Sequence, residues 1–149
     1  MPSLFDAEVN AQTLARIDAL APDARPQWGK LSLAGMLAHC AIPLRSASGE
    51  APLKRSLIGR LLGGLVKKKF LSDAPFARNG PTDPRLLVAD PRDVEAERAE
   101  LRRLVADFGA RGPAILAEGP HPFFGPLTDE EWGLLMWKHL DHHLTQFGA

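Results

Sequence analysis

Residues 128–148 read TDEEWGLLMWKHLDHHLTQFG, and this stretch decides the fold class. Thr128, followed three residues later by Glu131, forms a capping box, which predicts that a helix starts here. Apolar residues then recur at three- and four-residue spacings as far as Phe147, and Gly148 is placed to end the helix. The stretch therefore predicts a long amphipathic helix that closes the chain.

Three other segments show the same helical period. The first covers residues 3–20, and the second covers residues 32–42, where Pro43 is expected to stop it; each begins at a serine suited to cap it. The third starts at the N-cap and first-turn proline of Asp90-Pro91 and ends at Arg111. No segment shows convincing strand alternation, so the sequence predicts an all-α four-helix bundle with a long crossover between helices two and three.

The composition sets further limits on the class of protein. A chain of 149 residues has the commonest domain size, so residues 1–149 are expected to form one domain, and 45% hydrophobic residues suffice for a core. Eighteen basic residues balance eighteen acidic ones, which removes the positive field that nucleic-acid binding requires. A single cysteine, Cys40, excludes an internal disulfide and favours a reducing compartment. Without a membrane span or signal-peptide pattern, we expect a cytoplasmic protein.

The strongest chemical pattern is the histidine pair His139 and His143 on the last predicted helix. Residues four apart lie one turn apart along a helix and about 40° apart around it, so both imidazoles can reach one metal ion. His142 projects about 60° from His139 on the other side, which places it at the edge of that face. The pair lies within an apolar stripe, where uncompensated polar groups are costly.

His39 is the natural third ligand, because its neighbours along the face of the second predicted helix are small or apolar and turn it inward. Three neutral imidazoles would suit zinc, nickel, iron or manganese, and they leave a coordination position for water or a substrate. Spacing alone leaves an alternative open. In that alternative, His39 is a hydrogen-bonded core residue, and His139 and His143 are helix-end residues favoured by the helix dipole.

Several longer strings resemble a known superfamily. LSLAGMLAHC at residues 31–40 and KHLDHHLTQFG at 138–148 are similar to the DinB-like (YfiT-like) four-helix metalloenzyme superfamily. LLGGLVKKKFL, NGPTDP and HPFFGPLTDEEWGLLMWKHLDHHLTQFG resemble an uncharacterised branch of it, a domain of unknown function. The resemblance implies that residues 1–149 form one DinB-like helical bundle. It also implies that His39, His139 and His143 bind a divalent metal.

The same resemblance implies a class of function. Members with known activity include transferases that use a metal to activate bacillithiol or mycothiol. We therefore expect a metal-dependent transferase or hydrolase that acts on a small-molecule substrate, with a low-molecular-weight thiol as a candidate cofactor. The alternative is a non-enzymatic metal-binding or stress-associated bundle protein. Gln146 and His142 are candidates to orient a metal ligand or a substrate, whereas Cys40 is interpreted as buried packing.

Residues 54–71 form a basic amphipathic segment with helical spacing of leucines and six lysines or arginines. Three interpretations are open: a crossover helix packed on the bundle, a contact in a homodimer, or an element at a membrane surface. The pair Gly63-Gly64 weakens an isolated helix, so packing on the bundle is favoured over a membrane or a second copy.

Overall fold

The computed structural model describes residues 1–89 and 92–149, and the described part is all-α, with no β-strand. An isolated β-bridge joins His121 to Gly125. The helices of the described residues are α1 (Ala7–Ala19), α2 (Leu33–Ser48), α3 (Leu57–Phe70), α4 (Val94–Arg111) and α5 (Asp129–Gln146), with short 3₁₀ turns η1 (Pro84–Leu86) and η2 (Gly112–Ile115).

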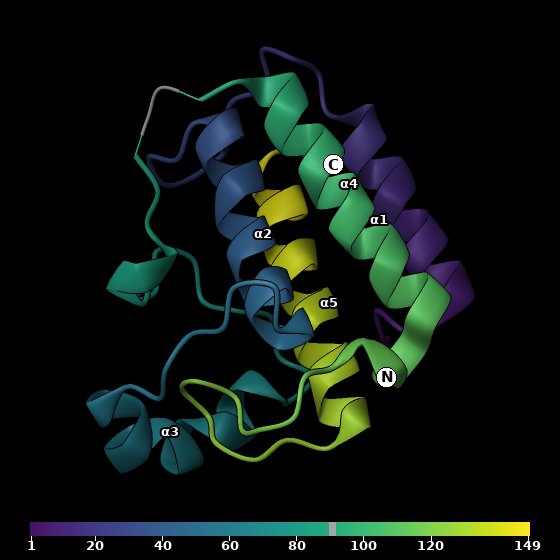
Figure 1. Cartoon of the computed structure of the whole chain (residues 1–149). Coiled ribbons are helices and arrows are strands. Elements are labelled where there is room, and N and C mark those ends of the chain that lie inside the picture. Colours follow the sequence, from purple (N-terminus) through teal and green to yellow (C-terminus); the bar gives the residue numbers. More distant parts are fainter. Residues whose placement is uncertain (90–91) are drawn as a thin grey trace.

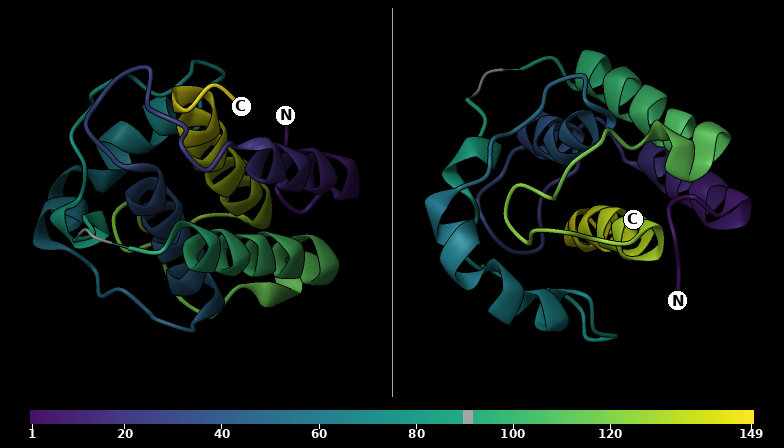
Figure 2. Two further views of the ribbon diagram at one scale, coloured as in Figure 1. Left: turned by 90° about the horizontal axis from the view of Figure 1, so that it is seen from above. Right: turned by 60° about the horizontal axis from the view of Figure 1, so that its bottom comes forward.

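Helices α1, α2, α4 and α5 pack as a bundle, and α3 lies outside it (Figure 1). α4 and α5 each contact both α1 and α2, so the order around the bundle is α1, α4, α2, α5 (Figure 2). α2 is buried along most of its length, which makes it the central helix and explains its apolar sequence. The largest fully buried side chains between the four helices include Ile17, Met36, Leu37, Leu101, Leu104, Phe108, Leu140 and Leu144.

The helix starts follow local capping chemistry. The capping box of Thr128 and Glu131 is confirmed at the start of α5, and Ser32 caps α2 by accepting from the Gly35 amide. The expected start of the first helix at Ser3 is wrong. Asp6 is the N-cap of α1, because its carboxylate accepts from the amides of Glu8 and Val9.

The expected end of α2 before Pro43 is also wrong, because the helix continues to Ser48. Pro43 has no N–H to donate to the carbonyl of His39, and a proline inside a helix costs about 3 kcal/mol. Burial of Leu44 and Ala47 in the next turn offsets that cost. The helix ends instead at Gly49, whose φ of 81° is the left-handed conformation that glycine adopts most readily.

Helix α4 begins at Val94, where the Asp93 carboxylate accepts from the Ala96 amide. The cap and first-turn proline expected at Asp90-Pro91 lie outside the described residues. Later in α4, the buried guanidinium of Arg98 donates to the carbonyl oxygens of Ile17 and Leu20. This contact satisfies carbonyls at the C-terminal end of α1 and ties the two helices together.

Helix α3 packs on the loop that precedes α5, and it does so through its glycine side. Gly59 and Gly63 face the backbone of Phe123. The Lys67 ammonium donates to the Pro126 carbonyl at 3.0 Å and forms an ion pair of 2.7 Å with Glu131. The sequence favoured packing of this segment on the bundle, whereas α3 packs on the loop before α5 and its leucines face solvent.

The two central glycines of α3 should respond in opposite ways to alanine. A Cβ at residue 63 would overlap the Phe123 carbonyl oxygen, whereas a Cβ at residue 64 meets nothing within 4 Å. We expect Gly63→Ala to lower hydrogen-exchange protection of the α3 amides at least tenfold. Gly64→Ala should raise it, because alanine stabilises a helix by about 0.5–1 kcal/mol relative to glycine. Equal protection in the two variants would contradict this packing.

Candidate metal centre

Three imidazoles converge between α2 and α5. His39 comes from α2, and His139 and His143 come from consecutive turns of α5. One nitrogen from each ring lies within 4.8 Å of the other two, and the ring centroids are 4.6–4.9 Å apart. The closest approach is 2.9 Å, between Nε2 of His39 and Nε2 of His139. The structure thus brings together all three histidines that the sequence singled out.

The orientation of His39 is fixed by a backbone group from the crossover. Its Nδ1 lies 2.8 Å from the carbonyl oxygen of Leu86, in η1. A carbonyl oxygen only accepts, so Nδ1 carries the proton and donates it. The neutral ring therefore presents the lone pair of Nε2 to the other histidines, as a metal ligand must.

The orientation of His143 is fixed by a relay through Gln146. The Gln146 amide nitrogen donates to the Trp28 carbonyl at 2.7 Å, so the amide oxygen turns the other way. That oxygen lies 2.8 Å from Nδ1 of His143 and accepts its proton. The Nε2 lone pair of His143 is thereby left free. The expected orienting role of Gln146 agrees with this contact.

Burial keeps all three imidazoles neutral. His39 is 4% exposed and His143 is 9% exposed. Desolvation lowers the pKa of His39, lowers the pKa of His143 to about 4, and holds the pKa of His139 well below its usual value. Neutral imidazole is the form that coordinates a metal, so no ring has to lose a net positive charge near pH 7.

The donor set fits a divalent ion. Two imidazole nitrogens bound to one tetrahedral ion at about 2.0–2.1 Å would lie about 3.3 Å apart, close to the 2.9 Å between the Nε2 atoms of His39 and His139. No fourth His, Cys, Asp or Glu of residues 1–89 and 92–149 joins the group. A site of this kind retains an open coordination position.

His142 lies beside the cluster at the wall of a cavity of about 360 Å³. Its ring centroid is 5.0 Å from that of His143 and 5.7 Å from that of Trp28. Phe76, Arg78 and Trp28 also line the cavity, and none of the three converging histidines does. The edge position expected for His142 from helical geometry agrees with this placement.

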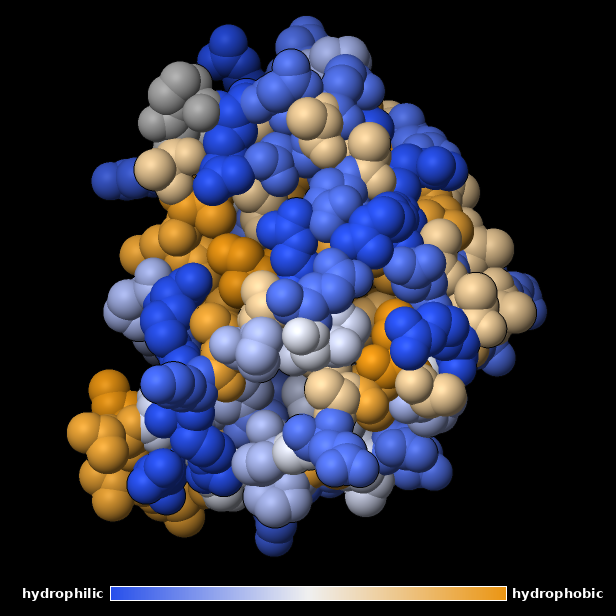
Figure 3. Space-filling model, viewed as in Figure 1, coloured by the Kyte–Doolittle hydropathy of each residue, from blue (hydrophilic) through white to orange (hydrophobic). Residues whose placement is uncertain are grey.

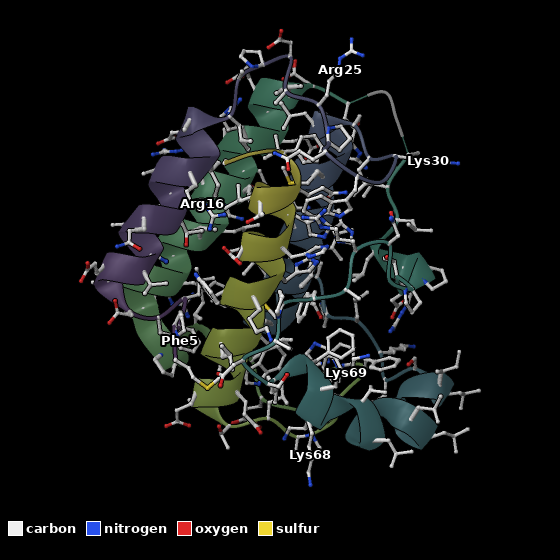
Figure 4. The ribbon with its side chains drawn as sticks, turned by 180° about the vertical axis from the view of Figure 1, so that it is seen from behind. Phe5, Arg16, Arg25, Lys30, Lys68 and Lys69 are labelled. Atoms are coloured by element: carbon white, nitrogen blue, oxygen red, sulfur yellow. The ribbon has the colours of Figure 1, made fainter. Side chains whose placement is uncertain are left out.

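The other polar candidates are engaged elsewhere. Cys40 is buried, burial raises the pKa of its thiol, and its Sγ contacts Met36, as expected for core packing. Asp141 forms an ion pair of 2.7 Å with Arg16 across the α1–α5 interface, and Figure 4 labels Arg16 on α1.

Lys138 instead holds the crossover. Its buried ammonium donates to the carbonyl oxygens of Ser72 and Ala74. His121 has a similar structural task, since its Nδ1 accepts from the amides of Phe123 and Phe124 and so shapes the loop before α5. Neither side chain is free to serve the histidine cluster.

Sequence reasoning missed the two backbone carbonyls that orient the cluster. Leu86 is 47 residues from His39, and Trp28 is 118 residues from Gln146. A carbonyl oxygen is present in every residue, so no side-chain pattern marks the two that are used. The NGPTDP string, which places η1, is the nearest sequence feature that could have drawn attention to Leu86.

The buried imidazoles predict how metal-free protein responds to acid. The pKa of His143 falls from 6.5 to about 4 on folding, so the unfolded chain binds more protons below pH 6.5. Stability should therefore be complete above pH 7 and fall as the pH drops toward 4, by on the order of 3 kcal/mol from His143 alone. Urea unfolding at pH 7, 6 and 5 in the presence of a chelator measures this, and His143→Gln should flatten the slope. A stability independent of pH over this range would contradict it.

Comparison with known proteins identifies the family to which the chain belongs. The chain has no significant match among curated proteins or solved structures. Residues 5–149 match the family described as "Protein of unknown function (DUF1569)", which covers the helices, the crossover and all three converging histidines. From this match over nearly its whole length, the chain belongs to the DUF1569 family.

Proposed function

We propose that this protein is a divalent-metal-dependent enzyme that acts on a small molecule, as a transferase or hydrolase, with the metal held by His39, His139 and His143. The observation that carries the proposal is the convergence of three neutral imidazoles, two with their tautomers fixed by hydrogen bonds, without a fourth His, Cys, Asp or Glu from the described residues. Structural zinc sites are closed by four protein ligands, whereas catalytic sites keep one position open.

The architecture supports the same proposal. One histidine on the second helix of the bundle and an i, i+4 pair on the last helix resemble the arrangement of the DinB-like (YfiT-like) superfamily. The long connection between the second and third helices of a four-helix bundle is consistent with that resemblance. By analogy, zinc, nickel, iron and manganese are the candidate metals, and a low-molecular-weight thiol is a candidate cofactor.

Each part of the site has a definable task. A divalent ion bound here would supply Lewis-acid activation of a water or thiol. The Leu86 carbonyl and the Gln146 amide hold the His39 and His143 rings in position, which avoids reorganising them when a ligand binds. The cavity beside His142 has room for a small molecule, and His142 separates it from the three converging histidines, none of which lines it.

A second function is favoured by a specific observation. The cluster joins α2 to α5, and two of its three rings are less than one-tenth exposed. An ion at this place would cross-link the two helices, as expected for a non-enzymatic metal-binding or stress-associated protein. The two functions differ in whether the ion accepts a ligand from solution.

The ligand set predicts a contrast between neighbouring histidines. His39→Ala, His139→Ala and His143→Ala should each abolish stoichiometric binding of zinc, because each leaves two of three nitrogens. His142→Ala is the matched control and should retain one equivalent, since its ring faces the cavity. Metal analysis of untagged protein, with a melting curve for each variant, measures this. Loss of metal in His142→Ala with retention in a folded His143→Ala would overturn the ligand assignment.

The orienting contact predicts a graded effect. Gln146→Leu removes the acceptor for the His143 Nδ1 proton but leaves all three ligands. Zinc affinity should fall about 10–100-fold, the usual effect of losing a partner of a ligand histidine. Competition titration against a chromophoric chelator measures this affinity. An affinity equal to that of the wild type would show that Gln146 does not orient the ring.

Exchangeable ligands distinguish the enzyme from the structural protein. In cobalt-substituted protein, an open position should bind added 2-mercaptoethanol and change the visible ligand-field spectrum. Turnover would then be sought with small electrophiles and a thiol. If the cobalt spectrum does not change with thiol, azide or imidazole, the enzyme proposal is wrong, and the ion has the structural role of a non-enzymatic metal-binding protein.

A further inference from the structure

Helix α3 carries an exposed row of large apolar side chains, which we call the α3 ridge. The molecule shows this ridge as an apolar protrusion at its lower left (Figure 3). Exposure of single side chains reaches 78%, so the ridge contributes almost nothing to the core. Its members are Leu57 (77% exposed), Ile58 (63%), Leu61 (78%), Leu62 (48%) and Leu65 (78%).

The ridge is held outward by the packing of the opposite side of the helix. At 100° per residue, the ridge covers an arc of about 140°, and Gly59 and Gly63 lie on the opposite side. Those glycines rest on the Phe123 backbone, and Phe70 packs against Phe76 and Phe124 with ring centroids 5.1 and 5.0 Å away. The helix is therefore fixed with its apolar face toward solvent.

The charged side chains of the segment that carries the ridge are all of one sign. Residues 51–72 contain six lysines and arginines and no acidic residue, although the whole chain is neutral. Lys67 is paired with Glu131, whereas Lys68 and Lys69 are exposed at the C-terminal end of the ridge, and Figure 4 shows Lys68 directed away from the bundle. The remainder of the chain carries the compensating net negative charge.

A second copy of the chain is a poor occupant for this surface. In an antiparallel pair of α3 helices, the lysines of one helix would lie beside Arg60 and the positive N-terminal end of the other. In a parallel pair, the two lysine clusters would meet directly. Both arrangements place like charges together at the rim of the interface, which disfavours association.

We propose that the α3 ridge and its flanking lysines bind the surface of an anionic lipid bilayer, with α3 lying in the plane of the interface. Leucines enter the boundary between headgroups and acyl chains, and Lys68 and Lys69 contact lipid phosphates. No helix of the described residues is long and apolar enough to cross a bilayer, so the contact is peripheral. The sequence favoured packing of this segment on the bundle, and the exposed ridge is what changes that expectation.

Vesicle flotation of the full-length protein tests the proposal. The two probes are vesicles of phosphatidylcholine and phosphatidylglycerol in equal parts and vesicles of phosphatidylcholine alone. The wild type should partition into the mixed vesicles at least tenfold more strongly than into the neutral ones. Raising the salt concentration should weaken that binding, because the lysine contribution is screened.

Two pairs of variants separate the contributions. Leu61→Gln/Leu65→Gln should reduce partitioning at least tenfold, and Lys68→Gln/Lys69→Gln should reduce it about fivefold per lysine. Arg25→Gln/Lys30→Gln at the opposite end of the molecule (Figure 4) and Leu87→Gln, an exposed leucine outside α3, are matched controls that should bind like the wild type. All substituted side chains are exposed, so the melting temperatures should remain close to that of the wild type.

Three results would overturn the proposal: no partitioning into anionic vesicles, equal partitioning of the ridge variants and their controls, or a homodimer in solution that Leu61→Gln/Leu65→Gln converts to a monomer. The last result would show that a second copy covers the ridge. The flotation readout does not depend on metal or catalysis, so it stands apart from the proposed enzyme function.

Discussion

The contact between Nε2 of His39 and Nε2 of His139, 2.9 Å apart in the interior, is the constraint on which the rest of the structure depends. Buried ring nitrogens that lack partners destabilise a protein by about 1–3 kcal/mol each, so the surrounding elements must satisfy the nitrogens that point away from the contact. This requirement places α2 beside α5, brings the Leu86 carbonyl over His39, and uses Gln146 to connect His143 to the Trp28 carbonyl. The bundle is thereby specified by polar as well as apolar groups.

The sequence predicted the helices and the converging histidines because both depend on local periodicity. The i, i+4 spacing of His139 and His143 places them on one face whatever the tertiary context, and the capping box at Thr128 sets the phase of that helix. Pro43 was misjudged because the cost of a missing hydrogen bond is local, whereas the compensating burial of Leu44 depends on the whole bundle. The ion pair between Asp141 and Arg16 could not be predicted from local spacing, because α1 supplies the arginine from across an interface.

Helix α3 shows a different limit of periodicity. Its pattern defines two opposite sides, one of leucines and one containing Gly59 and Gly63, and a hydrophobic stripe is ordinarily expected to face the core. Close approach to the Phe123 carbonyl requires a residue without a Cβ, so the glycine side is the one that docks. A pattern that fixes amphipathicity does not fix which side is covered, because that choice depends on the surface that another part of the chain offers.

The connection between Ser48 and Val94 contributes few side chains to the core, and polar contacts hold it in several places. The Lys138 ammonium donates to the carbonyl oxygens of Ser72 and Ala74, and the His39 imidazole donates to the carbonyl oxygen of Leu86. Each of these contacts divides a long loop into shorter ones and so restricts the conformational freedom of the connection. The imidazole of His39 therefore holds the connection in place at Leu86 in addition to forming part of the cluster. Any interaction that fixes the position of this ring also restricts the motion of the connection at Leu86.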